Sequence, residues 1–391
     1  SYKGFKVYEG TLIGVDDTVR ALQDIAKNYR KRFDIPVIGV TGSVGKSTTK
    51  EMTAAVLGSE LDVLKTTGNY NGQIGLPLTL LNLESHHGAA VVEMGISKFG
   101  EMDRLADIAC ANIGIVTNIG VSHLENLKTS ENICAEKLKL LKDYKGKYYL
   151  NGDSPLLAGA ANLEDVTYFG LNGSYKYSAQ GIYFGSDSTE FVLVAPDFKD
   201  DITIPCLGMH NVYNALAAIA VALDMGIHLD DIKLGLLGYK GLSMRQQILN
   251  IQGLNIIDDS YNASPDSVKS SVSVMRALPI KGKNIVVMSD MLELGERSEQ
   301  IHYELGKYMA VEGIDVLITV GNLSKFIQRG ADDSPIYIKT VHCKDNGDAF
   351  KEVMTFAEPG DKILVKGSRG MHTEEIVSML RDALSEDRPQ N

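Results

Sequence analysis

The stretch VIGVTGSVGKSTTKEM, residues 37–52, constrains the fold of this chain more than any other. A run of Val and Ile leads into a turn rich in Gly and Ser, and the residues after it have the composition of a helix. The segment therefore predicts a strand, a phosphate-binding loop and a helix. In the strict Walker pattern G-x-x-x-x-G-K-[ST] the first glycine would stand at Val40, but here it is Gly42. The loop is a shorter variant of that pattern.

This turn carries the residue types that hold nucleotide phosphates. Where a strand turns into a helix, backbone N–H groups and the helix N-terminus converge on one anion. Lys46 would reach the terminal phosphates and Ser47 would bind Mg²⁺. A turn that only caps a helix is the alternative, and Gly-Lys-Ser-Thr at the junction favours phosphate binding. The residues expected to contact the nucleotide here are Gly42, Ser43, Gly45, Lys46, Ser47 and Thr48.

Short runs of Val and Ile alternate with helical periods along the chain, which predicts an α/β fold. With 391 residues the chain is too long for one ordinary domain. We expect a central P-loop-type parallel sheet over 37–243, with antiparallel strands within 165–205. A Gly-rich, weakly patterned stretch at 234–247 precedes a smaller Rossmann-like domain over 244–391.

Composition excludes several classes of function. The net charge is -11, from 39 basic and 50 acidic residues, which argues against nucleic-acid binding because that needs a basic surface. The four cysteines show neither a C-x-x-C pair nor zinc spacing, as in a reduced cytosolic protein. The longest apolar run, at 215–223, is too short to span a bilayer. We find no signal peptide and expect a cytoplasmic, monomeric protein.

Two further predicted strands end in polar side chains that suit a metal. Glu93 ends the strand in AAVVEMG, and His123 follows the strand in NIGIVTNIG. The carboxyl ends of parallel strands meet at one sheet edge, so Ser47, Glu93 and His123 lie where one Mg²⁺-nucleotide could collect them. Helix capping by Glu93 and a structural role for His123 are the alternatives. Lys137 and Lys139, on a helix shortly after, either form a solvated cationic face or point one amine into this site.

Polar side chains stand at strand ends in the second half as well. One strand ends in a polar run with Asp258, Asp259, Tyr261 and Asn262. Arg245 precedes it on the interdomain linker, where it either forms a plain salt bridge or closes on nucleotide phosphate. KGSRG at 366–370 presents Lys366 and Arg369 on a Gly-rich turn, a pair of cations well suited to a carboxylate.

The chain resembles the Mur ligases, the ATP-dependent amide-forming enzymes of peptidoglycan assembly, whose phosphate loop is the shorter T-G-[ST]-x-G-K-[ST]-[ST]. The stretches that carry the likeness, in the family's order, are GNYNGQIGLPLTLL, EMGISKFGEMDRLADIA, TNIGVSHLE, GMHNVYNALAAIA, DDSYNASPDS, DMLELGERSEQIH and VKGSRGM. They extend from about residue 10 to the C-terminus. Within the family the likeness is nearest to the ligases that join D-Ala-D-Ala to UDP-N-acetylmuramoyl-tripeptide (UDP-MurNAc-tripeptide).

The resemblance implies roles for individual residues. Lys46 and Ser47 would bind the ATP triphosphate and Mg²⁺, Glu93 and His123 would be metal ligands, and Lys137 would be carried as a carbamate that binds a second Mg²⁺. The remaining implied nucleotide contacts are Asn214 with adenine, Arg245 with phosphates and Asp259 with ribose. The residues expected near the muramyl substrate are Asn69 and Asn71, and those expected near the amine dipeptide are Tyr261, Asn262, Asp290, Lys366 and Arg369.

The chain departs from the family pattern in four places. Val44 stands where Asn is usual, Gly72 replaces an Asn of N-x-N-N, and MSDM replaces G-D-M. The family also carries an N-terminal domain that holds the UDP group, and we expect residues 1–36 to be a remnant of that domain and a linker helix. Either the chain is trimmed, or its acyl substrate is not a UDP-sugar.

The reaction implied is ADP-forming acid–amino-acid ligation. A carboxylate attacks the γ-phosphate of ATP, and the dipeptide amine then displaces phosphate from the acyl phosphate, with Lys46, His123, Lys137 and Arg245 as the catalytic group. A folylpolyglutamate or cyanophycin-type ligase and a non-catalytic Mur-like nucleotide-binding partner protein are the alternatives. A P-loop GTPase or motor is disfavoured because no N-K-x-D motif occurs.

Overall fold

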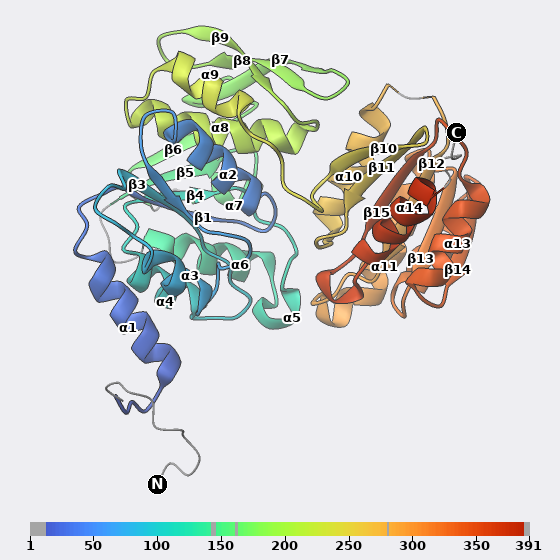
Figure 1. Ribbon diagram of the computed structural model, residues 1–391, viewed down its shortest axis with the longest axis horizontal. Helices are drawn as coiled ribbons and strands as arrows, with labels where there is room; N and C mark the ends of the chain where they lie inside the picture. The colour runs from blue at the N-terminus through green and yellow to red at the C-terminus, as the bar shows by residue number, and fades with distance from the viewer. Residues whose placement is uncertain (1–12, 142–145, 161–162, 280, 387–391) are drawn as a thin grey trace.

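The computed structural model describes residues 13–141, 146–160, 163–279 and 281–386. They form two α/β domains side by side, each built on its own sheet (Figure 1). The predicted α/β class is confirmed. The first twelve residues of the expected 1–36 segment lie outside the described residues, and the rest of it contains helix α1 (Thr18–Arg30), which packs on the first domain.

The first sheet has nine strands in the order β2-β3-β1-β4-β5-β6-β7-β8-β9. Its strands are β1 (Val37–Thr41), β2 (Val63–Lys65), β3 (Ala89–Glu93), β4 (Ile113–Val116), β5 (Lys147–Asn151), β6 (Val166–Gly170), β7 (Tyr177–Phe184), β8 (Thr189–Val194) and β9 (Lys199–Ile204). Pairing is parallel from β2 through β7 and antiparallel between β7, β8 and β9. The antiparallel strands expected within 165–205 are thus present at one edge.

Helices cover both faces of this sheet because its central strands are apolar on both sides. Their bounds are α2 (Lys46–Leu57), α3 (Gly75–Leu80), α4 (Glu101–Ala109), α5 (Leu124–Leu127), α6 (Ser130–Lys137), η1 (Leu138–Leu141), α7 (Pro155–Ala158), α8 (Met209–Asp224) and α9 (Leu229–Leu237). Successive β1 residues enter opposite cores: Val37 packs with α3 and α4, whereas Ile38 packs with α2 and α8. The first domain is therefore a three-layer sandwich.

The second sheet has six strands in the order β10-β11-β15-β12-β13-β14, all parallel except the edge strand β10. Its strands are β10 (Gln247–Ile251), β11 (Leu254–Asp259), β12 (Asn284–Ser289), β13 (Val316–Val320), β14 (Lys339–Cys343) and β15 (Lys362–Lys366). Its helices are α10 (Pro265–Ala277), η2 (Gly295–Arg297), α11 (Ser298–Val311), α12 (Ser324–Asp332), α13 (Asn346–Phe356), η3 (Arg369–Met371) and α14 (Glu374–Glu386). The predicted boundary after residue 243 falls between the two sheets.

One detail of the predicted helices is wrong. Lys137 and Lys139 were expected on one helix, but α6 ends at Lys137 and the chain continues as the tighter 3₁₀ turn η1. The turn packs Leu140 so closely on Gly114 that a Cβ there would lie 2.4 Å from Leu140 Cδ2. Packing onto β4 has overridden the local helical pattern.

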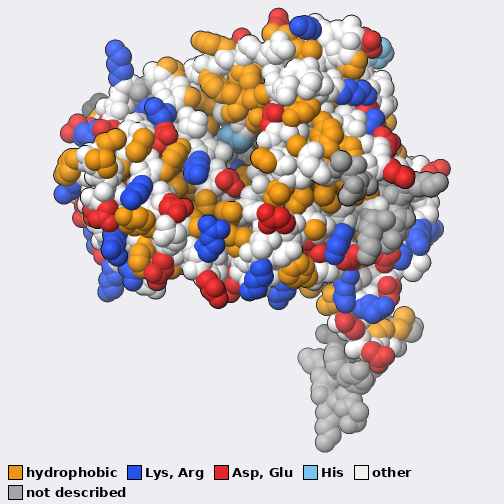
Figure 2. All heavy atoms as spheres, turned by 180° about the vertical axis from the view of Figure 1, so that it is seen from behind, with side chains coloured by type: hydrophobic (Ala, Val, Ile, Leu, Met, Phe, Trp, Pro, Cys, Tyr) orange, Lys and Arg blue, Asp and Glu red, His pale blue; other side chains and the backbone are white. Residues whose placement is uncertain are grey.

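One face of the molecule carries charged side chains of both signs. Figure 2 shows basic and acidic side chains interspersed over the face that it presents, with no extended basic area. Within the described ranges, no helix is both long and apolar enough to cross a membrane.

Candidate active site

The phosphate loop joins β1 to α2, and two glycines give it its shape. Gly42 (φ 150°) and Gly45 (φ 85°) adopt conformations that L side chains rarely reach. A Cβ on Gly42 would lie 1.9 Å from Thr117 Oγ1, and one on Gly45 would lie 2.6 Å from Asn214 Oδ1. No side chain caps α2, so its first N–H groups remain available to an anion.

Gly45→Ala is expected to lower the free energy of unfolding by about 1–3 kcal/mol through backbone strain and to weaken ADP binding at least about tenfold. The clash with Asn214 must displace either the loop or that side chain. Gly313→Ala is the matched control, because Gly313 has φ 73° and nothing within 4 Å of the added Cβ. Urea unfolding and calorimetric ADP titration of both variants would measure this. Unchanged ADP affinity in Gly45→Ala would contradict the expectation.

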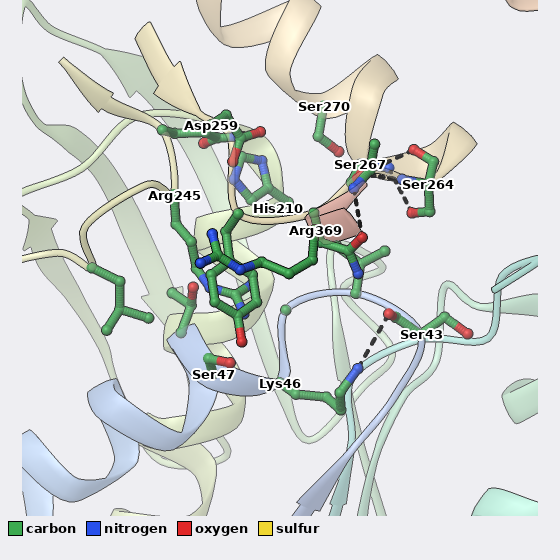
Figure 3. A pocket seen from close by; sticks show the side chains of 18 of the residues that line it. Ser43, Lys46, Ser47, His210, Arg245, Asp259, Ser264, Ser267, Ser270 and Arg369 are labelled. Atoms are coloured by element: carbon green, nitrogen blue, oxygen red, sulfur yellow. Dashed lines mark hydrogen bonds between the residues drawn. The ribbon is translucent and has the colours of Figure 1, made fainter. Parts of the chain in front are cut away.

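Lys46 begins α2 and folds back over the loop. Its Nζ donates to the carbonyls of Gly42 (3.0 Å) and Ser43 (3.3 Å) (Figure 3). Desolvation lowers the pKa of Lys46, nearby Glu93 opposes this shift, and the positive charge of Arg245 adds to it. The hydrogen-bond partners of this ammonium are neutral carbonyls, so no carboxylate among the described residues cancels its charge by direct contact. The positive charge can therefore attract an anion to the site.

Glu93 ends β3 beside the loop and is buried, with 2% of its surface exposed. Its carboxylate accepts hydrogen bonds from Ser47 Oγ (2.8 Å) and Asn71 Nδ2 (2.7 Å), both neutral donors. A buried carboxylate beside a hydroxyl suits a hard divalent cation, which prefers oxygen ligands. The residues present therefore fit Mg²⁺.

Lys137, at the end of α6, lies behind the loop. It is 1% exposed and its Nζ donates to the Gly42 carbonyl at 2.9 Å. Desolvation first, and then the charge of Lys46, hold the pKa of Lys137 well below its usual value, while Glu93 opposes the shift. Lys139 instead forms ion pairs with Asp103 and Glu136. Of the two lysines, only Lys137 approaches the predicted metal site.

His123 follows β4 and reaches toward the second domain. Its Nδ1 lies 2.5 Å from Glu293 Oε2, and the Glu125 N–H donates to the Glu293 carbonyl at 3.2 Å. Over the described part of the chain, no three His, Cys, Asp or Glu side chains are already grouped as a metal site. Ser47 and Glu93 are thus in contact, while His123 lines the same cavity in contact with a carboxylate of the other domain.

The opposite wall of the cavity belongs to the second domain. Asp259 accepts hydrogen bonds from Lys366 Nζ and from Ser271 Oγ, so its carboxylate and that ammonium neutralise each other. The guanidinium of Arg245 lies 4.1 Å from the centre of the Tyr261 ring, and that of Arg369 lies 5.8 Å from it. Figure 3 shows Lys46 and Ser47 across the cavity from Asp259.

The cavity has a volume of about 810 Å³ and is lined by both domains. That volume is in the range of sites for nucleotide-sized ligands. The predicted site residues that line it are Ser43, Gly45, Lys46, Ser47, Thr48, Asn69, Asn71, Glu93, His123, Asn214, Arg245, Asp259, Tyr261, Asn262, Lys366 and Arg369.

Comparison with known proteins identifies the family. Residues 40–222 match the Mur ligase middle domain, and residues 244–369 match the Mur ligase glutamate ligase domain. The chain belongs to the Mur ligase family. It is 41% identical over 372 residues to the UDP-N-acetylmuramoyl-tripeptide--D-alanyl-D-alanine ligase of Bacillus subtilis strain 168, covering 94% of this chain and 81% of that protein.

Two solved Mur ligase structures are similar throughout the fold. MurF from Acinetobacter baumannii superposes with a TM-score of 0.87 at 30% identity, covering 94% of this chain and 81% of that one. MurF from Thermotoga maritima, solved in complex with ADP, superposes with a TM-score of 0.87 at 28% identity, covering 98% and 88%.

Four of the predicted site residues of this Mur ligase lie elsewhere than expected. Asp290 is not in the cavity, because its carboxylate accepts the N–H groups of Asn322, Leu323 and Ser324 at the start of α12. Lys366 is not on the Gly-rich turn but at the end of β15, buried and paired with Asp259. Lys137 and Gly42 lie behind the cavity wall.

Sequence reasoning missed other residues of this Mur ligase site. Asn118 Oδ1 accepts the N–H groups of Ser43 (3.1 Å) and Val44 (2.8 Å) and so fixes the loop. His210 lines the cavity, and burial lowers its pKa to about 4, so it is neutral at pH 7. Asn118 lies in TNIGVSHLE and His210 in GMHNVYNALAAIA. Both stretches were recognised in the sequence, but only other residues in them were predicted to belong to the site.

Proposed function

We propose that this Mur ligase joins D-Ala-D-Ala to UDP-MurNAc-tripeptide, using ATP and forming ADP and phosphate, in peptidoglycan precursor synthesis. The observation that carries this proposal is the single cavity that has the phosphate loop on one wall and Arg245, Tyr261 and Arg369 on the other. A ligase of this kind must bring ATP, a carboxylate and an amine together. In this cavity the first domain would bind ATP and the muramyl substrate, and the second domain would bind the amine. We expect the protein to act in the cytoplasm as a monomer.

The first wall binds the ATP triphosphate. The free N–H groups at the start of α2 and the Lys46 ammonium offer positive potential to the phosphates. Arg245 adds a guanidinium from the far side of the cavity. Their charges let the anionic carboxylate of the tripeptide approach the γ-phosphate, so that a carboxylate oxygen forms the new P–O bond as ADP leaves.

Ser47, Glu93 and His123 would hold Mg²⁺, which supplies further neutralisation of phosphate charge. Lys137, as a carbamate, would contribute to a second Mg²⁺. Its low pKa favours the neutral amine, which is the form that adds CO₂ with loss of a proton. A carbamate there would also replace a buried positive charge beside Lys46 with a negative one, relieving the repulsion between the two lysines.

The second wall receives the amine substrate. Arg369 is half exposed and lies near the Tyr261 ring, and its Nη1 pairs with Glu374 at 3.1 Å. The remaining N–H groups of its guanidinium can bind the terminal carboxylate of the dipeptide. Asn262 lies beside it on the cavity wall. The dipeptide amine then attacks the acyl carbon and expels phosphate. Asn69 and Asn71, on the first domain, line the part of the cavity proposed for the muramyl substrate.

Phosphate release from ATP is expected to require both UDP-MurNAc-tripeptide and D-Ala-D-Ala, with turnover at least about tenfold lower when either is omitted. The reason is that an acyl phosphate forms only on the bound carboxylate and is consumed only by the amine. A coupled phosphate assay with single-substrate controls measures this, and mass spectrometry identifies the pentapeptide product. Equal phosphate release without the tripeptide would refute the proposal, and tight ADP binding without any turnover would favour a non-catalytic partner protein.

A further inference from the structure

A loop of the second domain makes the closest polar contact with the predicted metal-binding histidine. Glu293, four residues after β12, places Oε2 2.5 Å from His123 Nδ1. The same residue accepts the Glu125 N–H through its carbonyl. A Cβ on Gly295 would lie 3.1 Å from the Cα of Glu125, so the loop sits tightly against this turn. The contact joins the two domains at α5 and η2.

The loop that carries Glu293 is held in one conformation from behind. The Met291 N–H donates to Nε2 of the fully buried His302 (2.9 Å), whose Nδ1 donates to the Ser298 carbonyl (2.6 Å). Burial lowers the pKa of His302, which keeps the imidazole neutral and able to accept from Met291. The Leu292 N–H donates to Ser368 Oγ (2.9 Å). Glu293 itself has φ 64°, a backbone conformation that is rare outside glycine. The loop therefore holds the Glu293 backbone in an unusual conformation that directs its side chain toward His123.

We infer that Glu293 is a positioning residue for His123. A carboxylate at Nδ1 accepts a hydrogen bond from the Nδ1–H group and so keeps the ring proton on that nitrogen. Nε2 then has the free lone pair, which is the form that binds a metal. Within the described residues Nε2 has no protein partner, and His123 lines the cavity. This inference rests on the proposed role of His123 in binding Mg²⁺.

Glu293 belongs to the second domain and His123 to the first, so their contact depends on how the two domains are placed. The histidine is fully oriented only while the domains are in contact, so metal binding and domain closure favour each other by the same factor. Carboxylate partners of metal-binding histidines commonly change metal affinity by about 10- to 100-fold. We therefore expect closure to strengthen metal binding by a factor in that range.

The experiment measures Mn²⁺ affinity, with Mn²⁺ as a paramagnetic substitute for Mg²⁺, in the full chain saturated with a non-hydrolysable ATP analogue. The electron paramagnetic resonance signal of free Mn²⁺ decreases when the ion binds, so it measures binding without turnover. Glu293→Ala is expected to weaken Mn²⁺ binding about 10- to 100-fold, and Glu293→Gln less, because its amide oxygen can still accept from Nδ1. Glu296→Ala is the matched control: it removes an exposed carboxylate from the same loop and should change nothing.

His123→Ala separates this inference from the proposed function. If His123→Ala leaves Mn²⁺ affinity unchanged, the proposed metal role of His123 is wrong. If His123→Ala weakens binding but neither Glu293 variant does, His123 binds metal without help from Glu293 and the inference fails. The double variant should bind no worse than His123→Ala, because both residues act through one ring. Full additivity of the two losses would also overturn the inference.

Small-angle scattering tests the link to closure. Adding the nucleotide analogue and Mn²⁺ is expected to reduce the radius of gyration of the wild-type chain more than that of Glu293→Ala at the same metal concentration. The Glu296→Ala control should behave as wild type. Equal compaction of Glu293→Ala and wild type would show that closure does not depend on this contact.

Discussion

Lys46→Met is expected to lower kcat/KM for ATP by about 10²- to 10³-fold, the usual cost of removing one preorganised charge from a transition state. The Lys46 ammonium is held by the Gly42 and Ser43 carbonyls at the start of α2, on the wall proposed for the phosphates. We expect the unliganded variant to be as stable as the wild type or slightly more stable. The folded state lowers the pKa of Lys46, so the charged amine is less favourable in the fold than in the unfolded chain at neutral pH.

This opposite effect on activity and stability is what distinguishes a functional lysine from a structural one. Lys50→Met, one turn further along α2, is the control. Lys50 is buried, donates to the Thr66 carbonyl (2.7 Å) and pairs with Glu51, and it does not line the cavity. The Lys50→Met variant should be less stable than the wild type but should bind ADP with the same affinity. Urea unfolding and ADP titration of both variants provide the comparison, and a Lys46→Met protein that keeps wild-type kcat/KM would exclude the proposed role.

The sequence was sufficient to predict the site residues whose positions follow from a short motif or from the end of a strand. The phosphate loop could be predicted because glycines at 42 and 45, a lysine and a serine must stand in that order between a strand and a helix. Glu93 and His123 could be placed at one sheet edge because parallel strands end together. These predictions needed only the periodicity of strands and the topology of a parallel sheet.

The rest depended on which side chains meet across the fold. Asp290 directly follows β12 and Lys366 ends β15, but the first caps the start of α12 and the second neutralises Asp259. The contact between His123 and Glu293 joins positions 170 residues apart, in different domains. A local pattern carries no information about such a pairing, which is set by how two separately folded sheets dock. Family resemblance supplied roles for residues, but not these partners.

Lys137→Met is expected to lower the rate of phosphate release by about 10²- to 10³-fold, and to abolish carbamate formation at this site. The amine lies beside Lys46 and behind the loop, with its pKa held well below the usual value, so at neutral pH far more of it is uncharged than in an exposed lysine. Only the uncharged amine can attack CO₂, releasing one proton as the N–C bond forms. Burial at this position therefore makes Lys137 reactive as well as inaccessible to bulk water.

Lys139→Met supplies the matched comparison for Lys137→Met. Lys139 lies two residues away but is paired with Asp103 and Glu136, an environment that favours its charged form and raises its pKa. Incubation with ¹³C-labelled CO₂ should give one carbamate carbon resonance in the wild type and in Lys139→Met, and none in Lys137→Met. A short carboxylate such as acetate should partly restore phosphate release in Lys137→Met by filling the space with the missing negative charge. A carbamate signal that persists without Lys137, or full activity in its absence, would show that the buried amine only supports the Gly42 carbonyl.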